Sequence, residues 1–366
     1  MKIAIVSLVL HSNYGGILQS YALQTVLERM GHEVEVLRKP AVKWPSKYKY
    51  PFCIAKRMVK RLIDGKTPVF YEKNKERQLA SVRKNTELFI NKYIHVRYID
   101  SFKDIKEDEY DAFVVGSDQV WRPRYFTKQW GATIDNAFLS FTKGWNVKRV
   151  AYAASFGVDE CEYTEQELKD CSNALKLFDA ITVREFSGID LLQKYFGCTS
   201  EQVIDPTLLL TKDDYLSLIK NEAKSKGSLL VYVLDENDEI KELVKRVAKE
   251  KGLNPFYITV SKTETQPNVE TWLKGFADAD FVVTDSFHAC VFSVIFEKPF
   301  VVVGNKDRGN ARFKTLFEVL GTQENFIDKI SLFDAEFTYQ KYKDSSILCE
   351  KKYKTFVFLN ENLGEI

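Results

Sequence analysis

Short apolar segments rich in β-branched residues alternate along this chain with helical segments. Residues 2–9 and 111–115 are two such apolar runs, and each is followed by a loop of small and polar residues. Strands that alternate with helices build parallel sheets, because a crossover helix returns the chain to the same direction. The pattern therefore predicts an α/β fold with ligand sites at the carboxyl ends of its strands.

The clearest unit is FVVTDSFHACVFSVIFEKPF, residues 281–300. A short strand is expected to end at Thr284, with Asp285 or Ser286 as the N-cap of an apolar helix. His288 then lies in the first helical turn, where free backbone N–H groups and the helix dipole attract anions. The unit predicts an imidazole beside an anion site. The alternative is a hydrogen-bonded structural histidine, which is the commoner case for a lone histidine.

The same pattern predicts elements along most of the chain. Strands are expected at residues 2–9, 33–37, 111–115, 149–155, 180–183, 229–234, 255–260, 281–283 and 299–303. Helices are expected at residues 17–30, 52–63, 70–92, 164–177, 187–196, 238–251, 270–278, 287–296 and 345–362. Two βα series follow from this, and a boundary is expected at Asp205–Pro206.

We therefore expect an N-terminal domain over residues 1–205 and a C-terminal domain over residues 206–340. A basic helical insertion at about 40–92 interrupts the first domain. Residues 341–366 are expected to contribute a C-terminal helix that packs back on the N-terminal domain.

Composition narrows the class of protein. The chain has 366 residues, of which 45% are hydrophobic and 28% charged, as in ordinary globular proteins. The apolar start MKIAIVSLVL has no signal-peptide cleavage site, so we expect a first strand and a cytoplasmic protein. The 6 cysteines and 4 histidines show no CxxC, HExxH or other metal-ligand spacing, so we expect reduced thiols and no metal site.

Charge is distributed unevenly. Residues 38–84 hold 15 Lys or Arg and 3 acidic residues, whereas the chain as a whole carries +2. Such a segment suggests an anionic partner: nucleic acid, a phosphorylated substrate or an anionic membrane surface. The commoner explanation is a solvated helical face.

Further loops after predicted strands have compositions typical of ligand sites. HSNYGG (11–16) and GSDQVW (116–121) combine small residues with polar ones, but neither is a GxGxxG or Walker sequence, so no nucleotide is specified. Arg184 follows a strand beside Glu185, where it would bind an anion or form an ion pair. Residues 304–314, GNKDRGNARFK, place Lys306, Arg308 and Arg312 one strand beyond His288. They predict a phosphate site, with a solvated basic turn as the alternative.

Several segments, in order, resemble the polysaccharide pyruvyl transferase family. They are NYGGILQSYALQ (13–24), DAFVVGSDQVW (111–121), ITVRE (181–185), IDPTLLL (204–210), TDSFHACVFSVIFEKPF (284–300) and NKDRGNARF (305–313). The resemblance implies two Rossmann-like domains facing a cleft, as in the GT-B arrangement. It also implies transfer of the enolpyruvyl group of phosphoenolpyruvate to a sugar, which forms a pyruvate ketal and releases phosphate. Ala289 and Cys290 stand where relatives often have Gly-Thr.

The resemblance suggests His288 and Arg184 as catalytic residues. It places the donor phosphoenolpyruvate at Ser286, Lys306, Arg308 and Arg312. The acceptor is expected against the first domain, with Tyr14 and Trp121 stacking on sugar faces. The candidate acceptor residues are Asn13, Tyr14, Gly15, Gly16, Gln19, Ser117, Asp118, Gln119, Trp121 and Ser155.

The residues suit this chemistry without the family name. An enol phosphate with a carboxylate needs several cations, and proton transfer near neutral pH suits histidine. We expect phosphoenolpyruvate as co-substrate with no other cofactor. The acceptor is expected to be a sugar of a bacterial polysaccharide or of its lipid-linked precursor. The basic segment 38–84 would then meet the cytoplasmic face of the inner membrane.

Two other functions suit the sequence less well. A GT-B nucleotide-sugar glycosyltransferase would need a ribose-binding carboxylate in the second domain, where basic residues stand instead. A nucleic-acid-binding module would use the basic segment, but the chain has no recognition motif and an overall charge near zero. We therefore expect no nucleic-acid partner.

Overall fold

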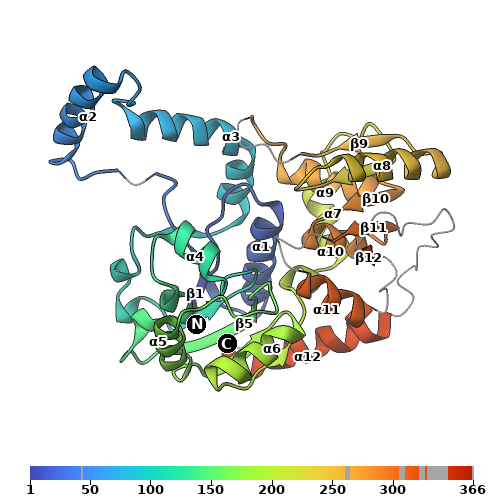
Figure 1. Cartoon of the computed structure of the whole chain (residues 1–366). Coiled ribbons are helices and arrows are strands. Elements are labelled where there is room, and N and C mark those ends of the chain that lie inside the picture. Colours follow the sequence, from blue (N-terminus) through green and yellow to red (C-terminus); the bar gives the residue numbers. More distant parts are fainter. Residues whose placement is uncertain (43, 260–263, 305–309, 321–325, 328–344, 365–366) are drawn as a thin grey trace.

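The computed structural model describes residues 1–364 except 43, 260–263, 305–309, 321–325 and 328–344. Two parallel β-sheets, each covered by helices, form two domains that meet along a shared core (Figure 1). This confirms the expected α/β class and the two Rossmann-like domains. In the described residues, no helix is long and apolar enough to cross a bilayer.

The N-terminal sheet has the strand order β3-β2-β1-β4-β5-β6-β7, with every pair parallel. Its strands are β1 (Lys2–Val6), β2 (Glu33–Arg38), β3 (Val96–Tyr98), β4 (Ala112–Val115), β5 (Lys148–Ala154), β6 (Ala180–Val183) and β7 (Glu201–Gln202). Its helices are α1 (Tyr14–Arg29), α2 (Tyr50–Asp64), α3 (Tyr71–Tyr93), α4 (Pro123–Trp130), α5 (Glu165–Leu175) and α6 (Phe186–Leu191). The order reverses between β1 and β4, which is where doubly wound sheets bind ligands.

The C-terminal sheet has the order β12-β11-β10-β8-β9, again all parallel. Its strands are β8 (Leu229–Tyr232), β9 (Pro255–Tyr257), β10 (Phe281–Thr284), β11 (Phe300–Val303) and β12 (Phe326–Ile327). Its helices are α7 (Lys212–Leu218), α8 (Asp238–Lys251), α9 (Val269–Asp278), α10 (Phe287–Ile295) and α11 (Ala311–Leu320). Here the order reverses between β8 and β10, so this sheet also has a crevice at a switch point.

The central strands are apolar on both faces. Every residue of β4, β8, β10 and β11 is buried, as expected for strands covered by helices on both sides. One core cluster runs without a break from Ile3 and Leu23 in the first domain to Trp272 and Phe292 in the second. The two sheets are therefore joined by apolar packing as well as by the connecting chain.

Two helical parts extend this frame. Helices α2 and α3 form the insertion, and α2 stands out from the body of the molecule (Figure 1). Helix α12 (Ser345–Leu363) returns to the first domain, where Lys351 donates to Gln202 and Lys148 donates to the carbonyl of Asn362.

Most predicted elements are confirmed, and the main differences lie at their ends. Helix α1 begins at Tyr14 rather than at residue 17, because Asn13 is its N-cap in extended conformation. The glycines of the NYGG segment therefore belong to the first turn and not to a loop. Strand β3 and helices α4 and α7 were not predicted, since three to eight residues show too little periodicity to identify an element.

Candidate active site

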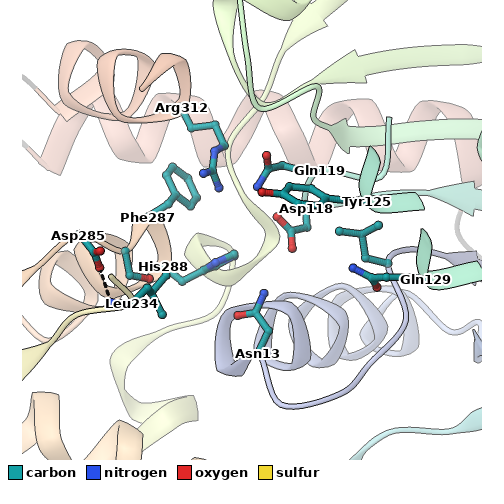
Figure 2. Close-up of a pocket in the computed structure, with 12 residues that line it drawn as sticks. Asn13, Asp118, Gln119, Tyr125, Gln129, Leu234, Asp285, Phe287, His288 and Arg312 are labelled. Carbon is teal, nitrogen blue, oxygen red and sulfur yellow. Dashed lines mark hydrogen bonds between the residues drawn. The ribbon is translucent and has the colours of Figure 1, made fainter. Parts of the chain in front are cut away.

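A polar cavity of about 200 Å³ lies where the switch points of the two sheets face each other (Figure 2). The first domain lines it with Leu8, Asn13, Asp118, Gln119, Tyr125 and Gln129. The second domain lines it with Leu234, Asp285, Ser286, Phe287, His288 and Arg312. Each segment that lines the cavity follows the carboxyl end of a strand, which is where a parallel sheet places its ligands.

His288 is the second residue of α10 and points across the cavity toward the first domain (Figure 2). Its side chain packs on the backbone of Gly15 in the first turn of α1. A Cβ on Gly15 would stand 2.1 Å from the Nδ1 of His288 and 2.7 Å from the Cβ of His288. Only glycine leaves room for the ring, so the two domains hold His288 between them.

Asp205 lies behind His288 at the junction of the domains. Its Oδ2 is 3.6 Å from His288 Nε2, just beyond hydrogen-bond distance. Its Oδ1 accepts hydrogen bonds from the backbone N–H and the hydroxyl of Thr207, which fixes the carboxylate. Asp205 is therefore placed to orient the imidazole and to stabilise positive charge on it.

Arg184 is shared between two carboxylates. Its Nη1 donates to Asp205 at 2.7 Å and its Nη2 donates to Asp118 at 3.3 Å. Burial alone would raise the pKa of both aspartates, but the positive charges of Arg184 and of nearby cations hold both pKa values below the usual range. Both carboxylates are therefore ionised at neutral pH. Arg184 lies behind the cavity, whereas the Asp118 side chain is part of the cavity wall.

Arg184 and Arg312 both lie over the ring of Phe287. Their guanidinium carbons are 4.5 Å and 5.4 Å from its centroid. Arg312, at the start of α11, lines the cavity directly. Burial, together with the charge of Arg184, lowers the pKa of Arg312 to about 10, so it stays cationic at neutral pH. It supplies a positive charge to the side of the cavity that the second domain forms.

The N-terminus of α10 faces the cavity. Its N-cap, Ser286, makes no side-chain capping bond, so first-turn N–H groups keep the capacity to bind a ligand. The neighbouring Asp285 accepts hydrogen bonds from the N–H groups of Leu234 and Asp235, which ties the end of β8 to α10. An anion at this helix start would meet backbone donors and the positive end of the helix dipole.

The first domain presents polar groups on the opposite wall. Asp118 has φ +60, a left-handed conformation that aspartate tolerates better than most residues. Tyr125 and Gln129 come from one face of α4, four residues apart. With Asn13 and Gln119, they form a wall of hydrogen-bonding groups suited to sugar hydroxyls. Tyr125, Gln129 and Asp205 were not predicted as site residues. The i, i+4 spacing in α4 and the Asp-Pro pair were the available signals.

Two predicted acceptor residues are corrected by the structure. The Tyr14 ring stacks on Trp272 at 5.5 Å, and its hydroxyl donates to the carbonyl of Pro267. Trp121 stacks on Phe138 at 4.9 Å and donates to a backbone carbonyl. Both rings are fully buried. They cannot stack on a sugar, because neither face is accessible.

Several small or polar acceptor candidates are also structural. Gln19 accepts from the backbone N–H of Ser117 and donates to Ser7. The Ser155 hydroxyl donates to Glu185. Three of these predicted residues are buried and are absent from the cavity wall: Gln19, Ser117 and Ser155. The cavity wall also does not include Gly15 or Gly16. Gly15 instead makes room for His288.

Six of the other predicted residues line this one cavity: Asn13, Asp118, Gln119, Ser286, His288 and Arg312. Arg184, predicted as catalytic, is not part of the cavity wall, because it is buried between Asp205 and Asp118. Lys306 and Arg308 lie outside the described residues. Within the described part of the chain, no group of three His, Cys, Asp or Glu is placed to hold a metal ion.

Comparison with known proteins identifies the family. The family model described as polysaccharide pyruvyl transferase matches residues 13–307, which is most of the chain. This protein belongs to the polysaccharide pyruvyl transferase family. Membership indicates a polysaccharide pyruvyltransferase, and the matched range includes the strand–helix units that build the cavity. None of the curated proteins matches the sequence.

Solved structures with a similar chain path have low sequence identity. A putative UDP-N-acetylglucosamine 2-epimerase from Listeria monocytogenes has 11% identity and a TM-score of 0.48, with 100% of this chain and 96% of that chain covered. The UDP-GlcNAc 2-epimerase of Methanocaldococcus jannaschii has 11% identity and a TM-score of 0.46, with 98% and 100% covered. The glycotransferase of kitacinnamycin has 14% identity and a TM-score of 0.42, with 100% and 96% covered. Similarities at this level carry no information on the reaction.

Proposed function

We propose that this family member transfers the enolpyruvyl group of phosphoenolpyruvate to a sugar of a polysaccharide or of its lipid-linked precursor. The observation that supports this most is the single cavity in which His288, Arg312 and the N-terminus of α10 face a polar wall of the other domain. The cations and amides suit a small dianionic donor. The polar wall suits a hydroxyl-rich acceptor.

In the proposed reaction the methylene carbon of phosphoenolpyruvate gains one proton, and C2 becomes an oxocarbenium-like centre. A sugar hydroxyl attacks C2 and loses its proton. The C2–O bond to phosphate breaks, a second hydroxyl of the same sugar closes the ketal and loses its proton, and that proton leaves with the phosphate. Two hydroxyl protons are thus divided between the new methyl group and inorganic phosphate.

His288 would exchange these protons, because it is an imidazole that lines the cavity from the second domain. Asp205 would orient its ring, and Arg312 with the α10 amides would stabilise the leaving phosphate. Arg184 would position Asp118 and Asp205 from behind the cavity. Asn13, Gln119, Tyr125 and Gln129 would hold the acceptor.

The test is phosphate release from phosphoenolpyruvate with a panel of synthetic and lipid-linked sugars, with the product identified by mass. Release should require a sugar and should add one ketal-linked pyruvate. His288→Ala should lower turnover about 100-fold or more, the range for loss of a general acid/base. His95→Ala is the matched control, because His95 is exposed on the surface. Near-native turnover of His288→Ala would contradict the proposed role. Transfer from a nucleotide sugar in place of phosphoenolpyruvate would show a glycosyltransferase.

A further inference from the structure

Helix α2 has an apolar face and a basic face. At helical spacing, Phe52, Ala55, Val59, Leu62 and Ile63 fall on one side. Arg57 and Arg61 fall on the opposite side, and Lys56 and Lys60 lie along one border of the apolar side. None of the residues of this helix is buried.

The apolar face of α2 points away from the protein. Phe52 is 77% exposed, Leu62 is 88% exposed and Ile63 is 82% exposed. The side that carries Arg57 faces the protein instead, because Arg57 forms a bidentate ion pair with Glu72 at 2.5 and 2.6 Å. A surface helix normally buries its apolar side, so this orientation is inverted.

The orientation is maintained by local contacts. Glu72 is buried in the first turn of α3, and the Arg57 guanidinium also lies 5.6 Å from the centroid of the Tyr71 ring. Gly65 ends α2 in a left-handed conformation, and the Asp64 carboxylate accepts hydrogen bonds from Lys66 and Thr67 in the turn that follows. The helix is therefore held with its apolar residues outward, on a part of the molecule that extends away from the second domain (Figure 1).

Exposed cations lie along α2 and in the segments before and after it. Exposed cations are Lys47, Lys49, Lys56, Lys60, Arg61 and Lys66. Tyr48 is exposed, and the half-exposed Trp44 packs against Tyr50 with 5.3 Å between ring centroids. An exposed apolar stripe bordered by lysines is the composition that enters a headgroup region.

We propose that α2 binds the surface of an anionic lipid bilayer. Its apolar face would enter the boundary between headgroups and acyl chains, and its lysines and arginines would extend to the lipid phosphates. A helix of 15 residues is too short to span the bilayer, so α2 would lie in this interface. Charge complementarity favours lipid over a second copy, because two copies would bring their basic residues together. The proposal does not depend on the reaction of the cavity.

The test uses the full-length protein with two kinds of vesicle. It should float with vesicles of phosphatidylglycerol and phosphatidylcholine, and much less with pure phosphatidylcholine. Raised salt should weaken the binding without abolishing it, because burial of the apolar face is not screened. No flotation with the anionic vesicles at low salt would overturn the proposal.

Matched variants locate the contact. The triple variant Phe52→Ser, Leu62→Ser and Ile63→Ser should weaken vesicle binding about tenfold or more, since it removes the apolar anchor. Leu88→Ser is the control, because Leu88, which is 63% exposed, is an apolar surface residue of α3 outside this face. Circular dichroism checks that α2 persists, and phosphate release with a water-soluble acceptor should be unchanged in all variants. Equal binding of the triple variant would overturn the proposal.

The oligomeric state separates lipid from a protein partner. Sedimentation without lipid should show no association that depends on the apolar face. A dimer that the triple variant abolishes, together with absence of vesicle binding, would show that α2 joins two copies and would overturn the lipid assignment.

Discussion

Asp205 is the residue on which the buried charges of the site converge. It contacts Arg184 and Thr207 and lies close to His288, and it is almost fully buried. If the buried Arg184 lost one carboxylate partner, the free-energy cost of removing its charge from water would remain, and less ion pairing would offset it. The role of Asp205 is therefore positional, and its loss should affect both stability and turnover.

We predict that Asp205→Asn lowers the free energy of unfolding by about 3 kcal/mol, as for other broken buried pairs. It should also lower kcat about tenfold or more with little change in KM for phosphoenolpyruvate, because it acts through His288. Denaturant unfolding and steady-state phosphate release measure the two effects. Glu297→Gln removes one partner of an exposed pair with Lys212 and should cost less than about 1 kcal/mol. A wild-type kcat in Asp205→Asn would contradict the positioning role.

His11 gives a prediction on pH. Burial, reinforced by the charges of Arg83 and Arg38, lowers the pKa of His11 to about 3. The unfolded chain binds a proton near pH 6.5, and the folded protein does so only near pH 3, so this contribution to stability is lost as pH falls between these values.

The free energy of unfolding should therefore fall below about pH 6.5 more steeply in the wild type than in His11→Gln. The difference in slope should reach at most about 1.4 kcal/mol per pH unit. Urea unfolding at several pH values measures it. His95→Gln, which changes an exposed histidine, should keep the wild-type slope. Parallel wild-type and His11→Gln curves would show that His11 does not carry the effect.

Helices α1 and α10 come from different domains and meet at Gly15 and His288. The contact explains the glycine at position 15, because any side chain there would occupy the place of the imidazole. The close approach of these two helices sets the width of the cavity at His288.

We predict that Gly15→Ala lowers turnover about 100-fold, because a displacement near 1 Å is enough to misalign a catalytic group. The cost in unfolding free energy should be about 1–3 kcal/mol, as for other overpacked sites. Gly16→Ala is the matched control, since its Cβ would meet only the Asn13 side chain at 3.3 Å. Phosphate release and thermal unfolding compare the two. Equal effects would mean that the Gly15–His288 contact is not the cause.

The two domains share one apolar core, so they should unfold together. Tyr14 of α1 crosses to the second domain, where its ring packs on Trp272 and its hydroxyl donates to Pro267. Since cooperativity follows from shared burial, the domains are expected to behave as one unit despite their separate sheets.

We predict a single denaturant transition, with tryptophan fluorescence and far-UV circular dichroism coincident. Tyr14→Ala should lower stability by about 3–5 kcal/mol, as for other large-to-small aromatic substitutions in cores, and should separate the two probes. Tyr48→Ala, which truncates a tyrosine that is 89% exposed, should leave the transition unchanged. Two transitions in the wild type would contradict a shared core.

The amino-acid sequence was sufficient for the α/β class, the parallel strands, the family and the placing of His288 and Arg312 at one site. These features depend on local patterns: apolar runs of strand length, helix starts, and charged residues just after strands. The structure agrees with these predictions because each pattern lies within a few neighbouring residues of the sequence.

Tertiary structure decided which of the candidate residues reach the cavity. Tyr14, Gln19 and Trp121 are of residue types suited to a sugar site, yet packing against distant parts of the chain buries them. Asp205 and the α4 residues enter the site only because distant strands end at the same edge. Burial and side-chain direction depend on contacts between residues far apart in the chain, and local sequence patterns do not record those contacts. The outward-facing apolar side of α2 follows the same logic, since the Arg57–Glu72 pair sets its direction.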